Sequence, residues 1–446
     1  MGQDTQNALP FASILGKKVE ADFDGGNVTT DGGAMFLRLV ESKVGIIDRI
    51  VSCLPDRRHA SYVRHSLEEM IQQRVFQIAC GYEDANDCNE LRRDPGFKAA
   101  CDRLPISGED LSSQPTMSRL ENSVRKTDLY RMARALVDQF QASYSTTPGE
   151  IILDADDTDD TVHGAQQLSL FNGYYGEHCF LPLYLFEGRS GKLITAVLRP
   201  GRRPTGKEIV AILKRVVAYL RKAWPHVRIL LRADSHFSTP EVHDWCEGNQ
   251  VYYVLGQAGN EKLEKQGRPL LAQARRLHST TREKVRLFES FMYQAGTWSK
   301  PRRIVFKAEV TPEGANPRFV VTNLHSSQAS FIYDHIYCAR GRMEGFIKNH
   351  KTFLHSDRTS CRKFTANQFR LLLHSAAYVL LHTLCEKGIQ GTQWARAQFD
   401  TIQNRILKVG ARVRELATKV RFHFPTSFPL KEVFARIIRN FASAYS

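Results

Sequence analysis

Residues 149–158 read GEIILDADDT, a short apolar run that ends in a group of acidic residues. Two further β-like runs, LPLYLFEG and KLITAVLRPG, lie within 181–201 and predict a hairpin. An amphipathic helix is predicted over 206–225, and apolar strands are predicted over 227–235 and 251–258. Strands that alternate with helices in this order predict an α/β domain built on a mixed sheet.

Acidic residues end two of these strands. Side chains alternate along a strand, so Asp154 and Asp156 share one face, and Asp234 ends the later strand ILLRADSHF at the matching position. Binding sites in α/β sheets form at the carboxyl ends of strands. Neighbouring carboxylates repel each other, and a hard divalent cation between them relieves the repulsion. We therefore predict a metal site at Asp156 and Asp234, whereas turn formation or helix capping is the interpretation favoured for Asp157, Asp159 and Asp160.

A second group of charged residues lies in the helical stretch SFIYDHIYCARGRMEGFIKNHKTF, residues 330–353. At about 100° per residue, one stripe of this helix contains Tyr337, Arg340, Glu344, Lys348 and Lys351. A stripe with one acid among three bases is not typical of a core. Two interpretations stay open: a functional surface, and a solvated face stabilised by pairs four residues apart, such as Arg340 with Glu344 and Glu344 with Lys348.

The spacing Tyr337-x2-Arg340-x3-Glu344-x6-Lys351 resembles the Y-R-E-K signature of bacterial insertion-sequence transposases, which are DDE enzymes with a ribonuclease-H-like fold. LDADDT and LLRADSHF resemble the strands that carry the first and second aspartates of that family. HGAQQLSLFNGYYGEHCFLPL, LRPG and FVVTNL are also similar to segments of those transposases, so the resemblance covers about 150–380. It implies a ribonuclease-H-like mixed α/β sheet flanked by helices, with a β-containing insertion, an N-terminal helical domain and a C-terminal helical region.

The resemblance implies that Asp156, Asp234 and Glu344 are the catalytic acids and the metal ligands. The separation between Asp234 and Glu344 is 110 residues, against 78 between the two aspartates. An insertion over 259–329, between the last sheet strand and the glutamate helix, accounts for the longer separation. Asp154 is the alternative first acid because it shares a face with Asp156, but Asp156-Asp157-Thr158 fits the Asp-x-Thr pattern of the family.

The implied chemistry is DNA cleavage and strand transfer with two Mg²⁺ ions, for which Mn²⁺ can substitute. The three carboxylates would hold the ions about 3.5–4 Å apart, so that one ion activates a water or a DNA 3′-hydroxyl and the other stabilises the leaving oxygen. Tyr337, Arg340, Lys348 and Lys351 would contact phosphates of the DNA end. Related enzymes proceed through a hairpin intermediate on the transposon end. For this chain, only the family resemblance implies such an intermediate.

The composition agrees with a nucleic-acid partner. The 446 residues include 62 Lys and Arg against 47 Asp and Glu, a formal net charge of +15 that favours a polyanionic partner. Nine cysteines without a CxxC pair argue against a zinc ribbon or a disulfide scaffold. No secretory signal is recognised, and the uncharged stretch 371–385 is too short and too polar to span a bilayer. We therefore expect a bacterial cytoplasmic protein that associates with the nucleoid and with no membrane.

Five regions are predicted along the chain. They are a mainly helical DNA-end-binding region (1–145), the first part of the catalytic domain (146–258), an insertion with β-strands (259–329), the glutamate helix with the end of the core (330–390) and a basic helical C-terminal region (391–446). Trp298, within the insertion, is predicted to pack in a core, with stacking on an unpaired base as the alternative.

The predicted function is that of an insertion-sequence transposase that binds terminal inverted repeats and moves its element by cutting and pasting. Its partners would be double-stranded DNA, as transposon ends and as target, and a second copy of the chain in a homodimer on DNA. Two alternatives are a catalytically inactive DNA-binding relic and a non-mobile ribonuclease-H-like nuclease. The presence of all three acids argues against the relic, and the Tyr-Arg-Lys stripe argues against the general nuclease.

Overall fold

The computed structural model describes residues 9–442 of the chain. These residues form two compact units, and each is described by itself. The first unit contains residues 9–47, 56–120 and 380–442, and the second contains residues 48–55 and 121–379. All of the predicted site residues belong to the second unit.

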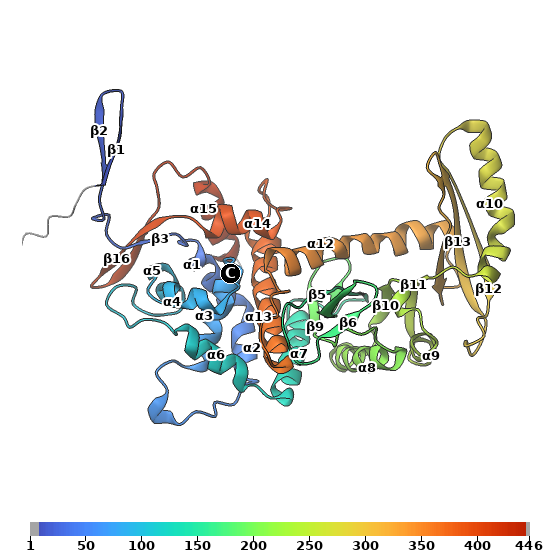
Figure 1. Ribbon diagram of the computed structural model, residues 1–446, viewed down its shortest axis with the longest axis horizontal. Coiled ribbons are helices and arrows are strands. Elements are labelled where there is room, and N and C mark those ends of the chain that lie inside the picture. Colours follow the sequence, from blue (N-terminus) through green and yellow to red (C-terminus); the bar gives the residue numbers. More distant parts are fainter. Residues whose placement is uncertain (1–8, 443–446) are drawn as a thin grey trace, which may run out of the picture. The chain divides into compact units, whose positions relative to one another are not determined.

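The second unit is built on a nine-stranded sheet (Figure 1). One part of it has the order β9 (Leu193–Val197), β8 (Leu183–Glu187), β4 (Glu150–Asp157), β10 (Arg228–Ala233) and β11 (Val251–Gln257). β4, β10 and β11 are parallel, whereas β8 is antiparallel to both β4 and β9. The predicted hairpin and the mixed, helix-flanked sheet of the ribonuclease-H-like fold are therefore confirmed.

The region after β11 extends the same sheet. Helix α10 (Glu261–Thr281) is followed by β12 (Val285–Tyr293), β13 (Arg302–Thr311), β14 (Gly314–Ala315) and β15 (Arg318–Thr322). β15 pairs antiparallel with β11, β13 pairs with β15, β14 and β12, and β12 forms the edge. The predicted insertion does contain β-strands, and these strands continue the central sheet instead of forming a separate one.

Trp298 lies between β12 and β13 and is only 6% exposed. Its ring lies edge-on to the rings of Tyr293 and His243, and the Arg302 guanidinium carbon lies 5.4 Å from its centroid. This tryptophan therefore packs in the core, as the sequence predicts.

Helices cover both faces of the sheet. On one face lie α7 (Lys126–Ala142), α8 (Gly206–Ala223), α9 (Pro240–Gly248) and α10. The opposite face packs against a helical segment at 329–353 and against α13 (Phe364–Thr383). Alternate strand residues supply the two cores: Leu231 faces α8 and α9, whereas its neighbour Leu230 faces the helical segment.

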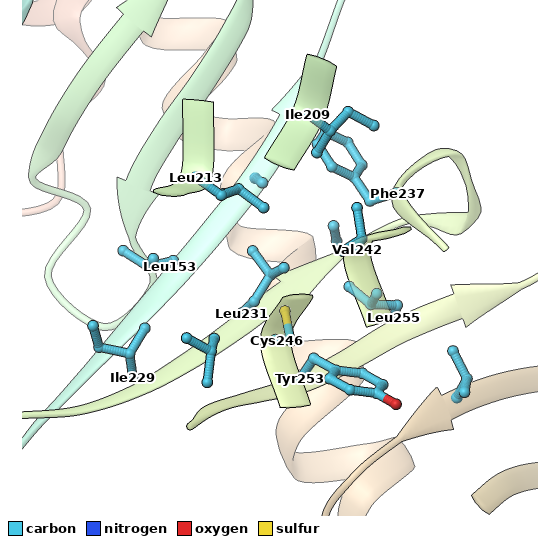
Figure 2. Close-up of a cluster of buried hydrophobic side chains, with 14 of the residues drawn as sticks. Leu153, Ile209, Leu213, Ile229, Leu231, Phe237, Val242, Cys246, Tyr253 and Leu255 are labelled. Carbon is cyan, nitrogen blue, oxygen red and sulfur yellow. The ribbon is translucent and has the colours of Figure 1, made fainter. Parts of the chain in front are cut away.

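Figure 2 shows the first of these cores. Side chains from three adjacent strands meet side chains from α8 and α9: Leu153, Ile229, Leu231, Tyr253, Leu255, Ile209, Leu213, Val242 and Cys246. Because these parallel strands are buried on both faces, their sequences are continuous apolar runs and not an alternation of apolar and polar residues.

Local sequence signals fix the helix starts around the sheet. The hydroxyl of Thr205 accepts a hydrogen bond from the Glu208 amide at 3.3 Å, and the Glu208 carboxylate accepts one from the Thr205 amide at 2.8 Å. Thr239 caps α9, and Pro240 occupies its first position, as expected from TPEVHDWCEGN.

The remaining elements are short. A small three-stranded sheet in the second unit has the order β5 (Asp160–Thr161), β7 (Glu177–Phe180) and β6 (Leu170–Asn172). In the first unit, β1 (Leu9–Ile14) pairs with β2 (Lys17–Ala21). Its helices include α1 (Ala34–Val44), α3 (Leu67–Ala79), α4 (Cys88–Leu91), α5 (Pro95–Ala100), α14 (Phe399–Ile402) and α15 (Lys431–Ala442); α2 (Ile46–Val51) and α6 (Gln114–Ser123) continue across the unit boundary along the chain.

The C-terminal region differs from the predicted helical region over 391–446. Strands β16 (Ala411–Leu416) and β17 (Lys419–His423) form a hairpin, and β16 also pairs with β3 (Val28–Thr29). The reason is a local period of two: Ala411 and Val413 are buried, while Arg412 and Arg414 are exposed. The first unit therefore combines residues of the predicted regions 1–145 and 391–446 through this three-stranded sheet.

Within residues 9–442, the helices are all too short or too polar to cross a membrane.

Leu231 provides a test of the core. Its side chain is fully buried between the sheet and the two helices above it, so Leu231→Ala leaves a cavity. We expect the free energy of unfolding to fall by about 2–5 kcal/mol, measured by urea denaturation. Leu277→Ala, at a 41% exposed position of α10, is the matched control and should change it by less than about 0.5 kcal/mol. Equal effects of the two substitutions would contradict this assignment of the core.

Candidate active site

The pairing of β4 with β10 brings two of the predicted acids to one edge of the sheet. The strands are parallel, with Arg232 opposite Asp154. Continuing this register by two residues places Asp234, which follows the end of β10, opposite Asp156. Asp234 begins a 3₁₀ turn, and its carboxylate accepts a hydrogen bond from the His236 amide at 2.9 Å. The predicted matching of Asp156 and Asp234 at two strand ends is confirmed.

Asp154 has a different environment from Asp156. Its two carboxylate oxygens accept hydrogen bonds from Nε and Nη2 of Arg232, both at 2.6 Å, and both residues are buried. Arg232 also donates through Nη1 to the carbonyl of Ile336 at 2.9 Å. Asp154 thus joins β4 to β10 and to the helical segment, which favours Asp156 as the acid available to a ligand. Arg232 was missed from the sequence, where a charged residue inside the apolar run ILLRADSHF was the only signal.

Asp156 is close to one cation and two other acids. Nη2 of Arg340 lies 3.2 Å from its Oδ2. Burial raises the pKa of Asp156 to about 7; Arg340 acts to lower this pKa, whereas Asp234 and Asp157 act to raise it. An added positive charge at this position would therefore stabilise the carboxylate.

Asp157 and Asp160 are neither turn formers nor helix caps, so that prediction is wrong for both. Asp157 ends β4 and accepts a hydrogen bond from Nη2 of Arg199 at 2.5 Å, and His236 Nδ1 lies 3.7 Å from its other oxygen. Burial opposes ionisation of Asp157, but His236 and Arg199 hold its pKa below the usual value. Asp160 lies in β5 with both carboxylate oxygens buried and without hydrogen-bond partners in the described chain, and burial raises its pKa. The two contacts of Asp157 leave no trace in the local sequence, because Arg199 and His236 are distant along the chain.

The predicted helix carrying the Y-R-E-K residues is a continuous but irregular helical segment. It consists of α11 (Ala329–Phe331), η4 (Ile332–Tyr337), η5 (Cys338–Gly341), α12 (Arg342–Lys348) and η6 (Asn349–Phe353). η4 and η6 are π-helical and η5 is a 3₁₀ helix. Such interruptions are frequent at functional sites because they re-aim side chains away from regular helical spacing.

Three residues of the predicted stripe point at the strand ends. The hydroxyl of Tyr337 lies over Gly256 in β11, so closely that a Cβ at this position would be 2.7 Å away. Arg340 reaches Asp156, and Nζ of Lys351 lies 3.2 Å from both Thr158 Oγ1 and an oxygen of Asp159. The predicted solvated face with ion pairs four residues apart is not observed: in the described chain, Glu344 pairs with neither Arg340 nor Lys348.

Glu344 and Lys348 are exposed on the same segment. They line a cavity of about 300 Å³, together with Asp156, Asp157, Thr158, Ile347, Lys351 and Thr352. This cavity brings Asp156 and Glu344 together with two of the predicted phosphate-binding lysines, whereas Asp234 lies beside Asp156 outside its lining.

The donor set suits a hard divalent cation. Asp156, Asp234 and Glu344 offer carboxylate oxygens, the ligands that Mg²⁺ and Mn²⁺ prefer. In the part of the chain that the structure describes, no three acidic, histidine or cysteine side chains are close enough to hold an ion together. Arg340 provides the positive charge at Asp156 in this arrangement. The residues therefore fit a metal by chemical type, and Arg340 would have to exchange partners for Asp156 to bind one.

The chain matches the model of the family described as "Transposase DDE domain group 1" over residues 11–445. No curated protein matches it. Among solved structures, it is similar to a chain of the cryo-EM structure of the piggyBac transposase synaptic complex with hairpin DNA, with a TM-score of 0.41 and 13% sequence identity, over 84% of this chain and 80% of that chain.

The pKa of Asp156 gives a pH-dependent prediction. Its value near 7 in the folded protein, above the ordinary 3.8, means that the folded state binds the proton more tightly than the unfolded state. This carboxyl therefore destabilises the fold increasingly as pH rises from about 4 to about 7. Without divalent metal, Asp156→Asn should be more stable than the wild type at pH 8, by at most about 4 kcal/mol, and the difference should shrink towards pH 5.

Thermal or urea unfolding in EDTA at pH 5 and pH 8 measures this difference. Asp157→Asn is the matched control, because the pKa of Asp157 is lowered and its loss should destabilise the protein at pH 8. Greater stability of the wild type than of Asp156→Asn at pH 8 would contradict the predicted charge balance.

Proposed function

The chain belongs to the transposase DDE domain group 1 family, and on this premise we propose that it is a metal-dependent DNA transposase of a bacterial insertion sequence. It binds the terminal inverted repeats of its element, cleaves the DNA at their boundary and transfers the strands to a target. The observation that carries the proposal is the convergence of Asp156, Glu344, Lys348 and Lys351 on one cavity, with Asp234 beside Asp156.

Asp156, Asp234 and Glu344 are the proposed catalytic acids and metal ligands. Divalent ions, proposed to be two Mg²⁺ with Mn²⁺ as a substitute, would supply Lewis-acid activation of the attacking hydroxyl and charge stabilisation of the leaving oxygen. Asp156 and Asp234 come from adjacent strand ends, so their relative positions are fixed by the sheet. Glu344 comes from a helical segment that packs on the same face of the sheet as Asp156.

Tyr337, Arg340, Lys348 and Lys351 are the proposed phosphate contacts. A phosphate at the cavity would meet the exposed ammonium of Lys348 and that of Lys351, which Thr158 and Asp159 hold in place. Arg340 has a planar guanidinium that binds phosphate oxygens in pairs, so DNA offers it a partner in exchange for Asp156. Entry of DNA would then free Asp156 for the metal, which couples substrate binding to assembly of the site.

The proposed partners are double-stranded DNA and a second copy of the chain. The formal net charge of +15 supports DNA binding, through the predicted end-binding region 1–145 and the basic region 391–446. Two ends of one element must be processed together, so we propose a homodimer formed on DNA. The proposed location is the bacterial cytoplasm, in association with the nucleoid.

A catalytically inactive DNA-binding protein of the same family is the competing function. It is favoured by one observation, the ion pair that places Arg340 at Asp156 where a metal would bind. Cleavage of DNA separates the two functions directly.

Cleavage is therefore the first test. A labelled duplex carrying the inverted repeat that flanks the gene should be nicked at the repeat boundary in Mg²⁺ and left intact in EDTA. Glu344→Gln should lower the rate by roughly a hundredfold or more, because it removes a charged group from the reacting centre, while DNA binding persists. Gel analysis of the products and anisotropy of the same duplex measure the two effects.

Glu261→Gln is the matched control, since Glu261 is an exposed glutamate at the start of α10. Binding without cleavage by the wild type, in both Mg²⁺ and Mn²⁺, would favour the inactive DNA-binding protein. Equal cleavage by Glu344→Gln would exclude Glu344 as a catalytic acid, and cutting throughout an unrelated duplex would favour a general nuclease.

Lys348 tests the proposed phosphate contacts. Lys348→Ala should weaken DNA binding to a similar extent for every sequence and lower the slope of log affinity against log salt by about 0.9, the value for one phosphate contact. Lys214→Ala removes a similarly exposed lysine from α8, on the opposite face of the sheet, and should leave the slope within error. Identical slopes for Lys348→Ala and the wild type would exclude a phosphate contact at Lys348.

A further inference from the structure

Helix α10 carries an excess of positive charge that the proposed catalytic site does not use. Residues 265–282 contain five Lys and Arg residues and no Asp or Glu. All five are exposed: Lys265, Arg268, Arg275, Arg276 and Arg282. The acids Glu261 and Glu264 precede this stretch and Glu283 follows it outside α10, so the second half of the helix itself contains no acid.

Three of these cations, Lys265, Arg268 and Arg275, lie on one stripe along the helix, with Arg276 directly beside it. Positions three and four apart follow one another through Lys265, Arg268, Ala272, Arg275 and Ser279, whereas Arg282 lies just beyond the helix as its C-cap residue. The stripe extends over about 21 Å from Lys265 to Ser279, at 1.5 Å per residue. The other two residues of the stripe, Ala272 and Ser279, have small side chains, so the backbone of a polyanion can approach the helix closely. The buried residues Leu263, Gly267 and Ala274 lie on the other side of α10.

The stripe is free of ion pairs, unlike the charges around it. Lys284 and Arg286 pair with Glu309 and Asp334, and Arg302 pairs with Asp244 and Glu247. Within residues 9–442, none of the five cations between 265 and 282 forms such a pair, although Glu261 and Glu264 have the spacing to bond Lys265 and Arg268. A cationic surface without internal partners is available to an external anion.

The stripe and the candidate active site lie on opposite faces of the sheet. On β13, Ile304 and Phe306 pack in the same core as Leu263 and Ala274 of α10, whereas Val305 packs in the core that contains Tyr333 of η4. Figure 1 shows α10 on the outer side of β12 and β13. DNA lying along the stripe is therefore a different stretch from the DNA at Asp156 and Glu344.

We propose that this stripe of α10 binds the phosphate backbone of duplex DNA, and that the duplex there is a segment other than the end held at the carboxylates. The chemistry is a row of cations at helical spacing without acids. Lys and Arg contacts to phosphate supply affinity without sequence information, so the surface binds any duplex. The biological role of this second segment, as flanking or target DNA, rests on the proposed function, but the binding itself does not.

The test uses the full chain and a labelled duplex of unrelated sequence, in EDTA. The double variant Arg275→Ala with Arg276→Ala should lower the slope of log affinity against log salt by about 1.8, or 0.9 for each lost contact. Extrapolated from 1 M to 0.1 M salt, this corresponds to a loss of affinity of up to about sixtyfold. Fluorescence anisotropy at four or five salt concentrations measures the slope.

Two further variants make the result specific. Lys214→Ala with Lys222→Ala removes two exposed lysines from α8 and so changes the net charge equally. Arg275→Lys with Arg276→Lys keeps the charge and should keep at least most of the slope, which a packing role of the arginines does not predict. An unchanged slope in the alanine variant, or an equal loss in the α8 variant, would overturn the proposal. A loss confined to vesicles containing phosphatidylserine, with DNA binding intact, would also overturn it in favour of a lipid surface.

The result of this binding test can be distinguished from the result of the cleavage test of the proposed function. The assay contains neither metal nor inverted repeat, so a protein without cleavage activity can still show the loss of slope. Conversely, metal-dependent cleavage at the repeat with no effect of the α10 variant would support the transposase and overturn only the second DNA surface.

Discussion

The buried ion pair between Asp154 and Arg232 is the interaction on which the candidate site depends. It joins two parallel strands, and the remaining Arg232 donor bonds to the Ile336 carbonyl in η4. Buried charges are tolerated only when each has its partners, and here both carboxylate oxygens and the guanidinium are satisfied by strong, charge-assisted bonds. The pair thereby holds the strand ends and the helical segment in one arrangement. Asp156 lies two residues beyond Asp154, and Tyr337 follows Ile336. The ion pair therefore also constrains the positions of Asp156 and Tyr337.

Besides Asp154, the carboxyl ends of the strands contain Asp156, Asp157 and Asp234. Burial of Asp156 and repulsion from the other two oppose its ionisation. Asp157 is balanced by Arg199 and His236, and Asp156 shares one contact with Arg340. Burial nevertheless raises the pKa of Asp156 to about 7, a sign that its charge is only partly compensated. A further cation would stabilise the ionised carboxylate, and under the proposed function that cation is a metal ion. Under the proposed function, Arg340 has two alternative partners, the Asp156 carboxylate and a DNA phosphate.

The insertion explains how one sheet can serve two surfaces. β12, β13 and β15 continue the central sheet, so each strand presents alternate residues to opposite sides. One side supports η4 and, through it, the site residues. The opposite side is covered by α10, whose outward stripe is basic. An insertion in a separate sheet would not fix these two surfaces relative to each other, whereas a continuous sheet does.

The amino-acid sequence determined the fold class and the candidates for the site. Apolar runs of strand length, capping residues such as Thr205 and Thr239, and acids at strand ends are local signals, and they identified the mixed sheet and the pair Asp156 and Asp234. The fixed spacing of Tyr337, Arg340, Glu344 and Lys351 indicated a DDE transposase, and the match over residues 11–445 shows a family of that class. Only the tertiary structure decided that Arg232 holds Asp154, that Arg199 and His236 contact Asp157, and that β16 and β17 replace an expected helix. Those outcomes depend on partners far apart along the chain: 78 residues separate Asp154 from Arg232, and β16 completes a sheet with β3 from the opposite end. The local sequence pattern indicates whether each segment prefers helix or strand. The pairing of distant segments is fixed only in the folded protein, where apolar side chains are buried and charged side chains find partners at the same time.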